Sequence, residues 1–349
     1  MVTEQGQDPH AHRRADPARD GGCDDGVLRV FVTTNLPDPG IGPLVAAGLD
    51  VDHRAVDGPP SRDELLAGVA EADGLICMLT ERVDEDLLAA APALKVVANY
   101  AVGFDNVDLD AATRRGVIVT TTPDVLTEAT AELAWTLLLA TARRVVEGDA
   151  LVRSGRWTTF SPTTLLGAPV AGRTLGIVGL GAIGAAVARR ARGFDMQVLY
   201  TNRGTNPVAE AELGATRVEL TELLRRSDFV SIHAPLNDDS RHLIDADALA
   251  HMRPTAILVN TGRGPVVDED ALVAALRSGA IAGAGLDVYE REPTLADGLA
   301  ELSNVVLLPH IGSATTDARG AMVQLCCENV IEVLAGRPAI TPRNAPPAG

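Results

Sequence analysis

The feature that most constrains the fold of this chain is a glycine-rich turn between a predicted strand and a predicted helix. Residues 176–184 read GIVGLGAIG, which places Gly179, Gly181 and Gly184 in the spacing G-x-G-x-x-G. In this setting the first glycine allows a tight turn, the second lets the backbone approach a pyrophosphate, and the third lets helix and strand pack closely. The turn therefore predicts a dinucleotide-binding βαβ unit, with phosphate on the free N–H groups of the helix start.

Strand-like and helix-like segments alternate on both sides of this turn. Before it come the β-branched runs LRVFVTT, GLICML, KVVANYA and GVIVTTT, and Ser61 and Glu64 predict a capping box at the start of one intervening helix. From Arg173 to about Pro309, six further strands read TLGIVGL, MQVLYTN, FVSIHAP, AILVNTG, GAGLDVY and NVVLLPH. This alternation predicts an α/β fold with two Rossmann-like, doubly wound parallel-sheet domains and a cleft between them.

The chain divides into a tail and two expected domains. Residues 1–25 are rich in Gly, Pro, Asp and Arg without periodicity and predict a disordered tail. We expect the dinucleotide-binding domain over residues 123–310. The substrate-binding domain is expected to be discontinuous, over residues 26–122 plus 311–340.

Two helical patterns connect these domains. The amphipathic stretch 124–152 is long enough for a single helix that runs between the lobes. A helix-forming stretch from about Ala314 to Leu334 is expected to return to the first lobe, which has only about five short strands of its own. The Pro- and Ala-rich residues after Arg337 predict a frayed end.

Charge and hydropathy exclude several classes of function. The net charge of −17 opposes binding to nucleic acid or to acidic membrane surfaces, and no basic patch offsets it. No apolar run approaches the roughly 18 residues needed to span a bilayer. We therefore expect a cytoplasmic protein without nucleic-acid or membrane partners.

The cysteines and the single lysine exclude further chemistry. Cys23, Cys77, Cys326 and Cys327 have neither zinc-ligand nor C-x-x-C spacing, so we expect reduced thiols and no metal. Lys95 is the only lysine, and it opens a strand pattern with no phosphate-binding motif near it. A mechanism through a Schiff base or a P-loop therefore has a single, unsuitable candidate.

The residues that end the second strand of the dinucleotide-binding unit bear on the choice of cofactor. An NAD-selecting site carries Asp or Glu there, to hold the ribose 2′-hydroxyl. This chain has Tyr200, Thr201, Asn202 and Arg203 instead. Since a guanidinium can grip a 2′-phosphate, Asn202 and Arg203 predict that NADPH is preferred, with NADH possible. The alternative is that Arg203 is a solvated surface charge.

Three strand-end segments of the second lobe carry chemically active side chains. They are VNTGRGPVVDEDAL with Arg263, GLDVYEREP with Asp287 and Glu292, and LLPHIGSAT with His310. Open α/β sheets bind ligands at the carboxyl ends of their strands, so we expect these side chains to gather in one cleft.

Together these segments resemble the D-isomer-specific 2-hydroxyacid dehydrogenases, in particular their glyoxylate/hydroxypyruvate reductase branch. The resemblance runs from about residue 28 to residue 336 and is also carried by MLTERVD, NYAVGFDNVD, TPDVLTEATAELAWTLLLATARR and SIHAPL. It implies hydride transfer from NAD(P)H to a small 2-oxoacid such as glyoxylate or hydroxypyruvate, with Arg263, Glu292 and His310 as the catalytic residues.

The implied chemistry requires these residue types. An imidazolium at His310 can protonate the carbonyl oxygen, because an unperturbed imidazole titrates near neutral pH. A carboxylate at Glu292 favours the charged form of that ring, and the fork of Arg263 holds the 2-oxoacid. The resemblance also implies that the N–H groups of Val102 and Gly103 hold the substrate carboxylate and that Leu79 shapes the pocket.

The remaining cofactor contacts are implied by the resemblance alone. These contacts are to the pyrophosphate, to the adenosine half and to the nicotinamide end of the cofactor. The residues that make them are Ala182, Ile183, His233, Pro235, Thr261, Gly262, Asp287 and Gly312. His233 has an equally favoured alternative as a strand-end histidine without a chemical role. The family often has arginine where Ala182 stands. Some members place an aromatic residue, which reaches the neighbouring subunit's pocket, where this chain reads SPTTLLG.

Three functional hypotheses follow. The first is an NADPH-dependent reductase that works as a homodimer. The dimer is expected from the resemblance and from the long apolar helix that begins at Asp124. The second, from another class, is a nucleotide-sensing binding protein like the transcriptional corepressors that share this fold. The third keeps the chemistry with another substrate, such as 3-phosphoglycerate or phosphite. It would need extra basic residues near Leu79 and Val102, where the nearest in sequence is Arg82.

Overall fold

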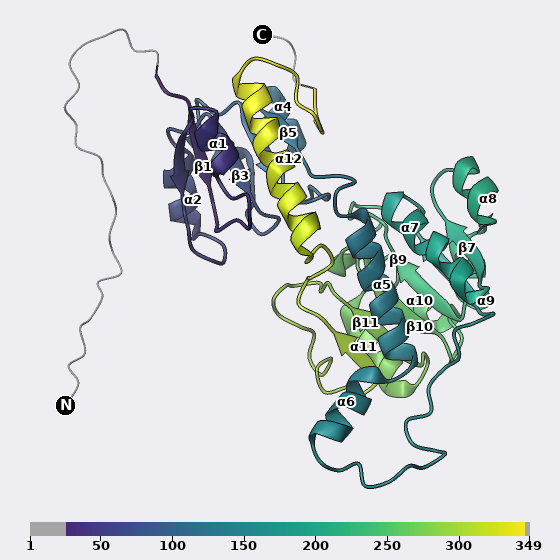
Figure 1. The fold of residues 1–349 in the computed structure, drawn as a ribbon. Helices are drawn as coiled ribbons and strands as arrows, with labels where there is room; N and C mark the ends of the chain where they lie inside the picture. Colours follow the sequence, from purple (N-terminus) through teal and green to yellow (C-terminus); the bar gives the residue numbers. More distant parts are fainter. Residues whose placement is uncertain (1–25, 346–349) are drawn as a thin grey trace, which may run out of the picture.

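The computed structural model describes residues 26–345, which form two parallel sheets with helices on both faces (Figure 1). The predicted tail, residues 1–25, lies outside the described residues. The first sheet has the strand order β2-β1-β3-β4-β5, and every strand pair in it is parallel. Its strands are β1 (Arg29–Val32), β2 (Asp50–His53), β3 (Gly74–Cys77), β4 (Val96–Asn99) and β5 (Ile118–Thr120).

The second sheet has seven parallel strands in the order β12-β11-β10-β9-β6-β7-β8. The six predicted strands are present, and the sequence analysis missed only β8, which has two residues and therefore no readable alternation. The strands are β6 (Thr174–Val178), β7 (Gln197–Thr201), β8 (Thr216–Arg217), β9 (Phe229–Ile232), β10 (Ile257–Asn260), β11 (Gly283–Leu286) and β12 (Val305–Leu307). The predicted fold class, two Rossmann-like doubly wound domains, is confirmed. The order reverses between β6 and β9, where such sheets open a ligand crevice.

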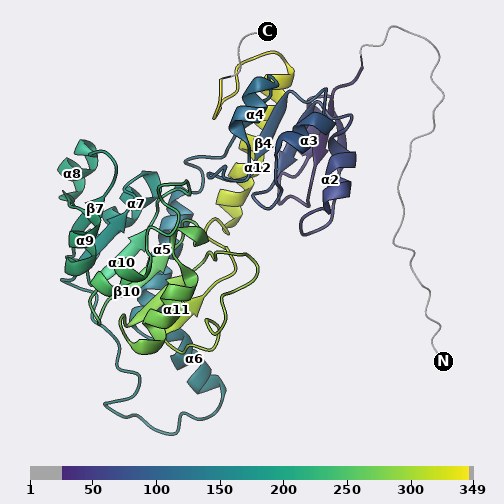
Figure 2. The ribbon, with the colours of Figure 1, turned by 180° about the vertical axis from the view of Figure 1, so that it is seen from behind.

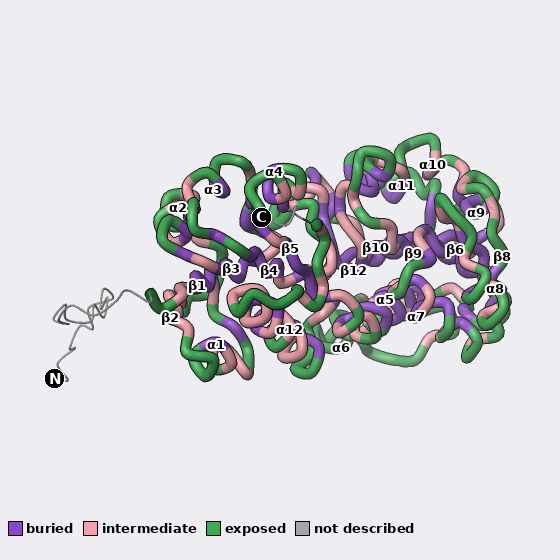
Figure 3. The backbone as a smooth tube through the Cα atoms, turned by 90° about the horizontal axis from the view of Figure 1, so that it is seen from above, coloured by how far each residue is buried: buried purple, intermediate pink, exposed green. Residues whose placement is uncertain are grey.

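Helices cover both faces of each sheet, which explains why the central strands β3, β4 and β9 are buried along their whole length (Figure 3). In the first lobe, α2, α3 and α4 lie on one face and α1 and α12 on the other; in the second, α9, α10 and α11 lie opposite α5 and α7 (Figures 1 and 2). The first-lobe helices are α1 (Gly42–Ala46), α2 (Arg62–Val69), α3 (Glu85–Ala90), α4 (Leu109–Arg114) and α12 (Thr316–Leu334). The second-lobe helices are α5 (Thr127–Ala142), α6 (Val145–Arg153), α7 (Ala182–Ala191), α8 (Pro207–Leu213), α9 (Leu220–Arg226), α10 (Ala246–His251) and α11 (Glu269–Ser278).

Helix α12 packs on the first sheet although it follows the last strand of the second. Its buried residues Val323, Cys326 and Val330 share a core with Val30 and Val96 of that sheet. A helix from the end of the chain thus supplies one face of the first lobe (Figure 1). The exact domain boundaries, 26–122 plus 311–340 and 123–310, stay a prediction.

Residues 338–345, which follow α12, correct the expectation of a frayed end, and residues 346–349 lie outside the described residues. Arg343 donates its backbone N–H to the carbonyl of Val119 at 2.8 Å, and Asn344 Oδ1 accepts the N–H of Val119 at 2.8 Å. The side chain of Asn329, which is fully buried, accepts the N–H groups of Ile340 and Thr341. The contacts combine backbone groups with two asparagine side chains, Asn329 and Asn344, so the Pro- and Ala-rich composition does not reveal them.

The long helix predicted over residues 124–152 is two helices. Arg144, between α5 and α6, has a left-handed backbone with φ of 54°, which an α-helix cannot accommodate. Helix α5 packs on the second sheet through residues such as Leu137 and Leu138, whereas α6 has no buried residue. The stretch therefore covers one lobe and then leaves it, and does not run as one rod between the lobes.

Two local predictions can be compared directly with the structure. The capping box at α2 is confirmed, because Ser61 and Glu64 each accept the other's backbone N–H. The described cysteines Cys77, Cys326 and Cys327 are free and buried, and burial raises the pKa of each thiol. Cys23 lies outside the described residues. Within residues 26–345, no helix is long and apolar enough to cross a bilayer.

The clamp on the C-terminal segment generates a stability prediction. Asn329→Ala should lower the free energy of unfolding by about 2 to 4 kcal/mol, because two backbone N–H groups lose their acceptor. The measurement is urea unfolding followed by circular dichroism. Gln324→Ala on the same helix, which removes only an exposed contact to Glu328, should change it by less than about 0.5 kcal/mol. Equal stabilities of the two variants would contradict the role of the clamp.

Candidate active site

One cavity of about 740 Å³ lies where the loops at the carboxyl ends of the two sheets face each other. Its volume is within the usual range for cofactor and ligand sites. Three predicted site residues, Gly179, Asn202 and Arg203, do not line it. Those that do are Leu79, Val102, Gly103, Gly181, Ala182, Ile183, Gly184, His233, Pro235, Thr261, Gly262, Arg263, Asp287, Glu292, His310 and Gly312.

The three glycines of the turn have different environments. A Cβ at Gly179, whose φ is +97°, would lie 2.6 Å from the backbone N of Ala234, and one at Gly184 would lie 2.3 Å from the carbonyl O of Gly179. A Cβ at Gly181 would meet nothing within 4 Å. The first and third glycines thus allow close backbone packing. Gly179 packs against the backbone of His233 and Ala234 and does not line the cavity. The second leaves open space before the start of α7, where no side chain caps the helix.

His310 and Glu292 form a hydrogen-bonded pair at the cavity wall. His310 Nδ1 lies 2.8 Å from Glu292 Oε2, and each side chain is 29% exposed. The N–H of Tyr289 donates to Glu292 Oε1 at 3.0 Å. Burial by itself would raise the pKa of Glu292, but the hydrogen bond and charge of His310, that N–H and Arg263 together lower it. Glu292 is therefore held as a carboxylate facing the imidazole.

Arg263 reaches across the gap between the lobes. Its Nε donates to Asp105 Oδ1 at 2.9 Å, and its Nη1 donates to the carbonyl of Gly262 at 3.0 Å. A Cβ at Gly103 would lie 2.0 Å from Nη2, so the guanidinium rests against that glycine. Among residues 26–345, this is the only ion pair between the two lobes. Asp105 was missed by the sequence analysis, although it lies in the quoted segment NYAVGFDNVD.

Two buried asparagines hold the turns that carry these groups. Asn99, at the end of β4, donates to the carbonyl of Gly103 at 2.9 Å. Asn260, at the end of β10, donates to the carbonyl of Arg263 at 3.0 Å and accepts the N–H of Gly262. The two lobes thus present their turns by the same device, a strand-end asparagine that satisfies loop backbone groups.

The second lobe has buried polar atoms that fit a dinucleotide. Asp287 Oδ2, Thr261 Oγ1 and His233 Nδ1 have no hydrogen-bond partner, and all three residues line the cavity. Burial lowers the pKa of His233 to about 4, so its ring is neutral at pH 7, and its Nε2 is 2.9 Å from Ser231 Oγ. Burial is also the main cause that raises the pKa of Asp287. Unpaired buried polar atoms are costly, and together with the open cradle at Gly181 they provide positions for a cofactor.

The end of β7 carries no carboxylate. Asn202 Oδ1 accepts the N–H of Leu180 at 2.7 Å, which ties its side chain to the glycine turn. The Arg203 side chain is 83% exposed, and its Nη1 lies 3.8 Å from Asp239 Oδ2. Arg217, on β8, donates to the carbonyl of Asn202 at 3.0 Å. A second arginine, which sequence analysis did not single out, thus borders this position.

Two cavity arginines come from segments far away in the sequence. Arg319 on α12 and Arg343 in the C-terminal segment line the cavity, and Arg343 Cζ lies 5.9 Å from the ring centroid of Phe104. Arg82, the nearest basic residue in sequence to Leu79, does not line it and pairs with Asp84. Sequence proximity therefore gave the wrong basic residue, because α12 returns to the first lobe only in the folded chain.

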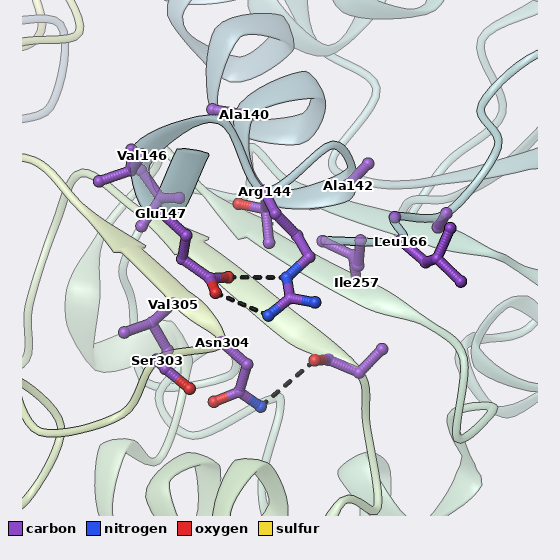
Figure 4. A pocket seen from close by; sticks show the side chains of 15 residues that line it. Ala140, Ala142, Arg144, Val146, Glu147, Leu166, Ile257, Ser303, Asn304 and Val305 are labelled. Atoms are coloured by element: carbon purple, nitrogen blue, oxygen red, sulfur yellow. Dashed lines mark hydrogen bonds and ion pairs between the residues drawn. The ribbon is translucent and has the colours of Figure 1, made fainter. Parts of the chain in front are cut away.

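A smaller cavity of about 280 Å³ lies apart from this site (Figure 4). It is bordered by the end of α5, the start of α6 and residues 166–168 and 303–306, and none of the predicted site residues lines it. The ion pair of Arg144 with Glu147, with contacts of 3.0 and 2.7 Å, lies inside it. Across residues 26–345, no group of three or more His, Cys, Asp and Glu side chains could hold a metal ion.

Comparison with known proteins gives a consistent result. The family described as D-isomer specific 2-hydroxyacid dehydrogenase, NAD binding domain, matches residues 135–312. The chain is 52% identical over 307 residues to a glyoxylate reductase of Thermococcus onnurineus, covering 87% of this chain and 92% of that protein.

Two similar solved structures have related descriptions. A glyoxylate reductase from Paecilomyes thermophila has a TM-score of 0.82 at 32% identity, covering 91% of this chain and 98% of that one. An NADPH-dependent glyoxylate/hydroxypyruvate reductase from Sinorhizobium meliloti, in complex with NADP and malonate, has a TM-score of 0.76 at 34% identity, covering 90% and 96%.

These relatives, the two parallel sheets and the nucleotide crevice support one assignment. The chain belongs to the family of D-isomer-specific 2-hydroxyacid dehydrogenases, which are NAD(P)-dependent oxidoreductases, and within it to the glyoxylate reductase branch.

Proposed function

We propose that this protein reduces glyoxylate, hydroxypyruvate or a similar small 2-oxoacid to the D-2-hydroxyacid, with NADPH as the preferred cofactor. The observation that carries the proposal is the convergence of Arg263, Glu292 and His310 on one cavity, next to the nucleotide crevice. The relatives' names support the substrate class. The names also favour an enzyme over a corepressor-like binding protein.

The proposed roles follow from the contacts of each side chain. When bound, the reduced nicotinamide supplies a hydride to the carbonyl carbon of the 2-oxoacid. His310, paired through Nδ1 with Glu292, would donate a proton from Nε2 to the carbonyl oxygen. Arg263 uses Nε and Nη1 for Asp105 and Gly262, which leaves Nη2 for the anionic substrate.

The first lobe would hold the other end of the substrate. Val102 and Gly103 lie in the turn that Asn99 supports, and Leu79 lies in the neighbouring loop after β3. The backbone N–H groups of Val102 and Gly103 can bind a carboxylate without adding a further positive charge, and Leu79 would shape the pocket. Ala182, Ile183, His233, Pro235, Thr261, Gly262, Asp287 and Gly312 are proposed to hold the cofactor, as the sequence analysis expected.

The proposed preference for NADPH rests on charge at the end of β7. Arg203 and Arg217 both border this position, and the acid that pairs with Arg203, Asp239, is 3.8 Å from it and 81% exposed. A 2′-phosphate could replace Asp239 as the partner of Arg203, because an exposed ion pair of this kind contributes little stability.

We also propose a homodimer, associated through the segment that follows α5. Six exposed large hydrophobic side chains cluster there, namely Val145, Val146, Val152, Trp157, Phe160 and Leu166. The α6 helix has no buried residue, and the smaller cavity opens beside it. Large exposed apolar patches are rare on monomeric proteins and often mark association surfaces. The cytoplasmic location stays a prediction.

The proton-donor role generates the first test of the proposal. His310→Gln should lower kcat for glyoxylate reduction by about 10²- to 10⁴-fold, because the ring that donates the proton is lost. The assay follows NADPH oxidation with glyoxylate, hydroxypyruvate, pyruvate and phenylpyruvate. Wild-type protein that turns over none of them would refute the proposed function, and an unaffected variant would refute the role of His310.

Cofactor choice can be reversed at the end of β7. The double variant Asn202→Asp, Arg203→Ser should raise KM for NADPH and lower it for NADH, because a carboxylate repels a 2′-phosphate and accepts a ribose hydroxyl. The readout is the ratio of kcat/KM for the two cofactors. An unchanged preference for NADPH would show that these residues do not select it.

Association can be tested by placing a charge in the exposed patch. Val146→Asp should shift the sedimentation coefficient toward that of a monomer, since a buried unpaired carboxylate opposes association. Val208→Asp on α8 is a matched control, because Val208 is similarly exposed outside the patch, at 65%. A wild-type protein that sediments as a monomer would overturn the proposed dimer.

A further inference from the structure

A buried carboxylate behind the active site has no role in the chemistry described so far. Glu269, the first residue of α11, is 3% exposed. Its Oε1 accepts the N–H of Glu290 at 3.0 Å, and its Oε2 accepts the N–H of Ala296 at 2.9 Å. Both oxygens therefore bind backbone on either side of Glu292, at the two ends of the loop 290–296.

The helix itself does not need this carboxylate. Asp268 already caps α11, because its side chain accepts the N–H of Ala271 at 2.9 Å. No Lys, Arg or His among the described residues pairs with Glu269. Burial raises its pKa, the two backbone N–H groups oppose this, and the charges nearby are Glu290 and Arg291. A carboxylate kept in so costly a place points to a function in the loop.

The loop that Glu269 binds sets the position of the proposed catalytic pair. Glu292 lies within this loop, and its carboxylate contacts two groups outside it, the N–H of Tyr289 at 3.0 Å and the ring of His310 at 2.8 Å. The loop is also pressed against the residue that follows Arg263. A Cβ at Gly264 would lie 2.5 Å from the backbone N of Glu290, the first residue of the loop. A shift of this loop would therefore disturb the positions of Glu292 and Arg263 together.

The neighbouring side chains make a second, weaker contact. Glu290 Oε2 accepts the N–H of Glu269 at 3.4 Å, and Glu290 Oε1 lies 2.8 Å from His242 Nε2. This outer pair is more accessible, with 40% of the His242 side chain and 25% of the Glu290 side chain exposed. Loss of His242 leaves both hydrogen bonds of the Glu269 carboxylate in place, so His242 provides a matched control.

We infer that Glu269 is a positioning residue: it clamps both ends of the loop 290–296 and so holds Glu292 in hydrogen-bonding contact with the ring of His310. The inference rests on the proposed function, because it assigns the pair Glu292–His310 to proton transfer. It adds a residue that touches neither substrate nor cofactor and acts only through the loop.

Glu269→Gln tests the clamp with almost no change in size. The amide of glutamine has only one acceptor oxygen, so it can accept the N–H of Glu290 or of Ala296 but not both. Its NH2 group would face the other N–H, two donors cannot pair, and one end of the loop is released. We expect kcat for glyoxylate reduction to fall by about tenfold or more, since the proton donor loses part of its support. The optimum of the pH–rate profile should move to lower pH, the same direction as for Glu292→Gln. His242→Gln should leave the profile unchanged.

Other outcomes overturn the inference. A folded Glu269→Gln variant with the wild-type kcat and pH profile would show that the carboxylate is only structural. If that variant does not fold, Glu269→Asp keeps the charge but is one methylene too short to reach both N–H groups. An unchanged pH profile for Glu269→Asp would equally refute the clamp.

A readout without turnover separates this inference from the proposed function. Histidine ring signals in NMR spectra can be assigned to His310 by comparison with His310→Gln. In Glu269→Gln these signals should differ in chemical shift from those of the wild type, because the contact of the ring with Glu292 changes, and identical spectra would overturn the clamp. Wild-type protein inactive on every 2-oxoacid would refute the proposed function and leave this comparison intact.

Discussion

A guanidinium selects an anion well only when its other donors are already fixed, and Arg263 is fixed from both lobes. Asp105 of the first lobe binds its Nε, and the carbonyl of Gly262 binds its Nη1. Since this is the only ion pair between the lobes within the described residues, the placement of Arg263 depends on the position of one lobe relative to the other. Under the proposed function, the anion site is therefore complete only when both lobes are in this arrangement.

On the opposite wall of the site, His310 is likewise held in place by residues that lie behind it. His310 is hydrogen-bonded to Glu292 through Nδ1, and Glu292 lies in a loop whose ends bind Glu269. Burial would raise the pKa of both carboxyl groups, yet only Glu292 faces an imidazole that lowers it again. Two neighbouring carboxylates, Glu269 buried and Glu292 partly exposed, therefore suit different tasks, one positional and one electrostatic, because their partners differ.

Much of this architecture could be predicted from the sequence. The glycine turn, the alternating strands and the capping box at Ser61 are local patterns, and local geometry decides them. The strand-end segments with Arg263, Glu292 and His310 could be expected to meet, because the carboxyl ends of parallel strands share an edge. The break at Arg144 could not be predicted, because the composition of residues 124–152 favours helix throughout and only packing requires the left-handed residue.

The sequence by itself determined the sheets, the nucleotide crevice and the chemical types at the strand ends, since each depends on a periodicity or spacing within a short segment. Only the tertiary structure decided which distant groups join them. It brought Asp105 to Arg263, placed Arg319 and Arg343 in the cavity, and turned Glu269 toward the loop of Glu292. Such contacts join residues about 20 to more than 200 positions apart. They are decided by how complete layers pack, which no local pattern encodes.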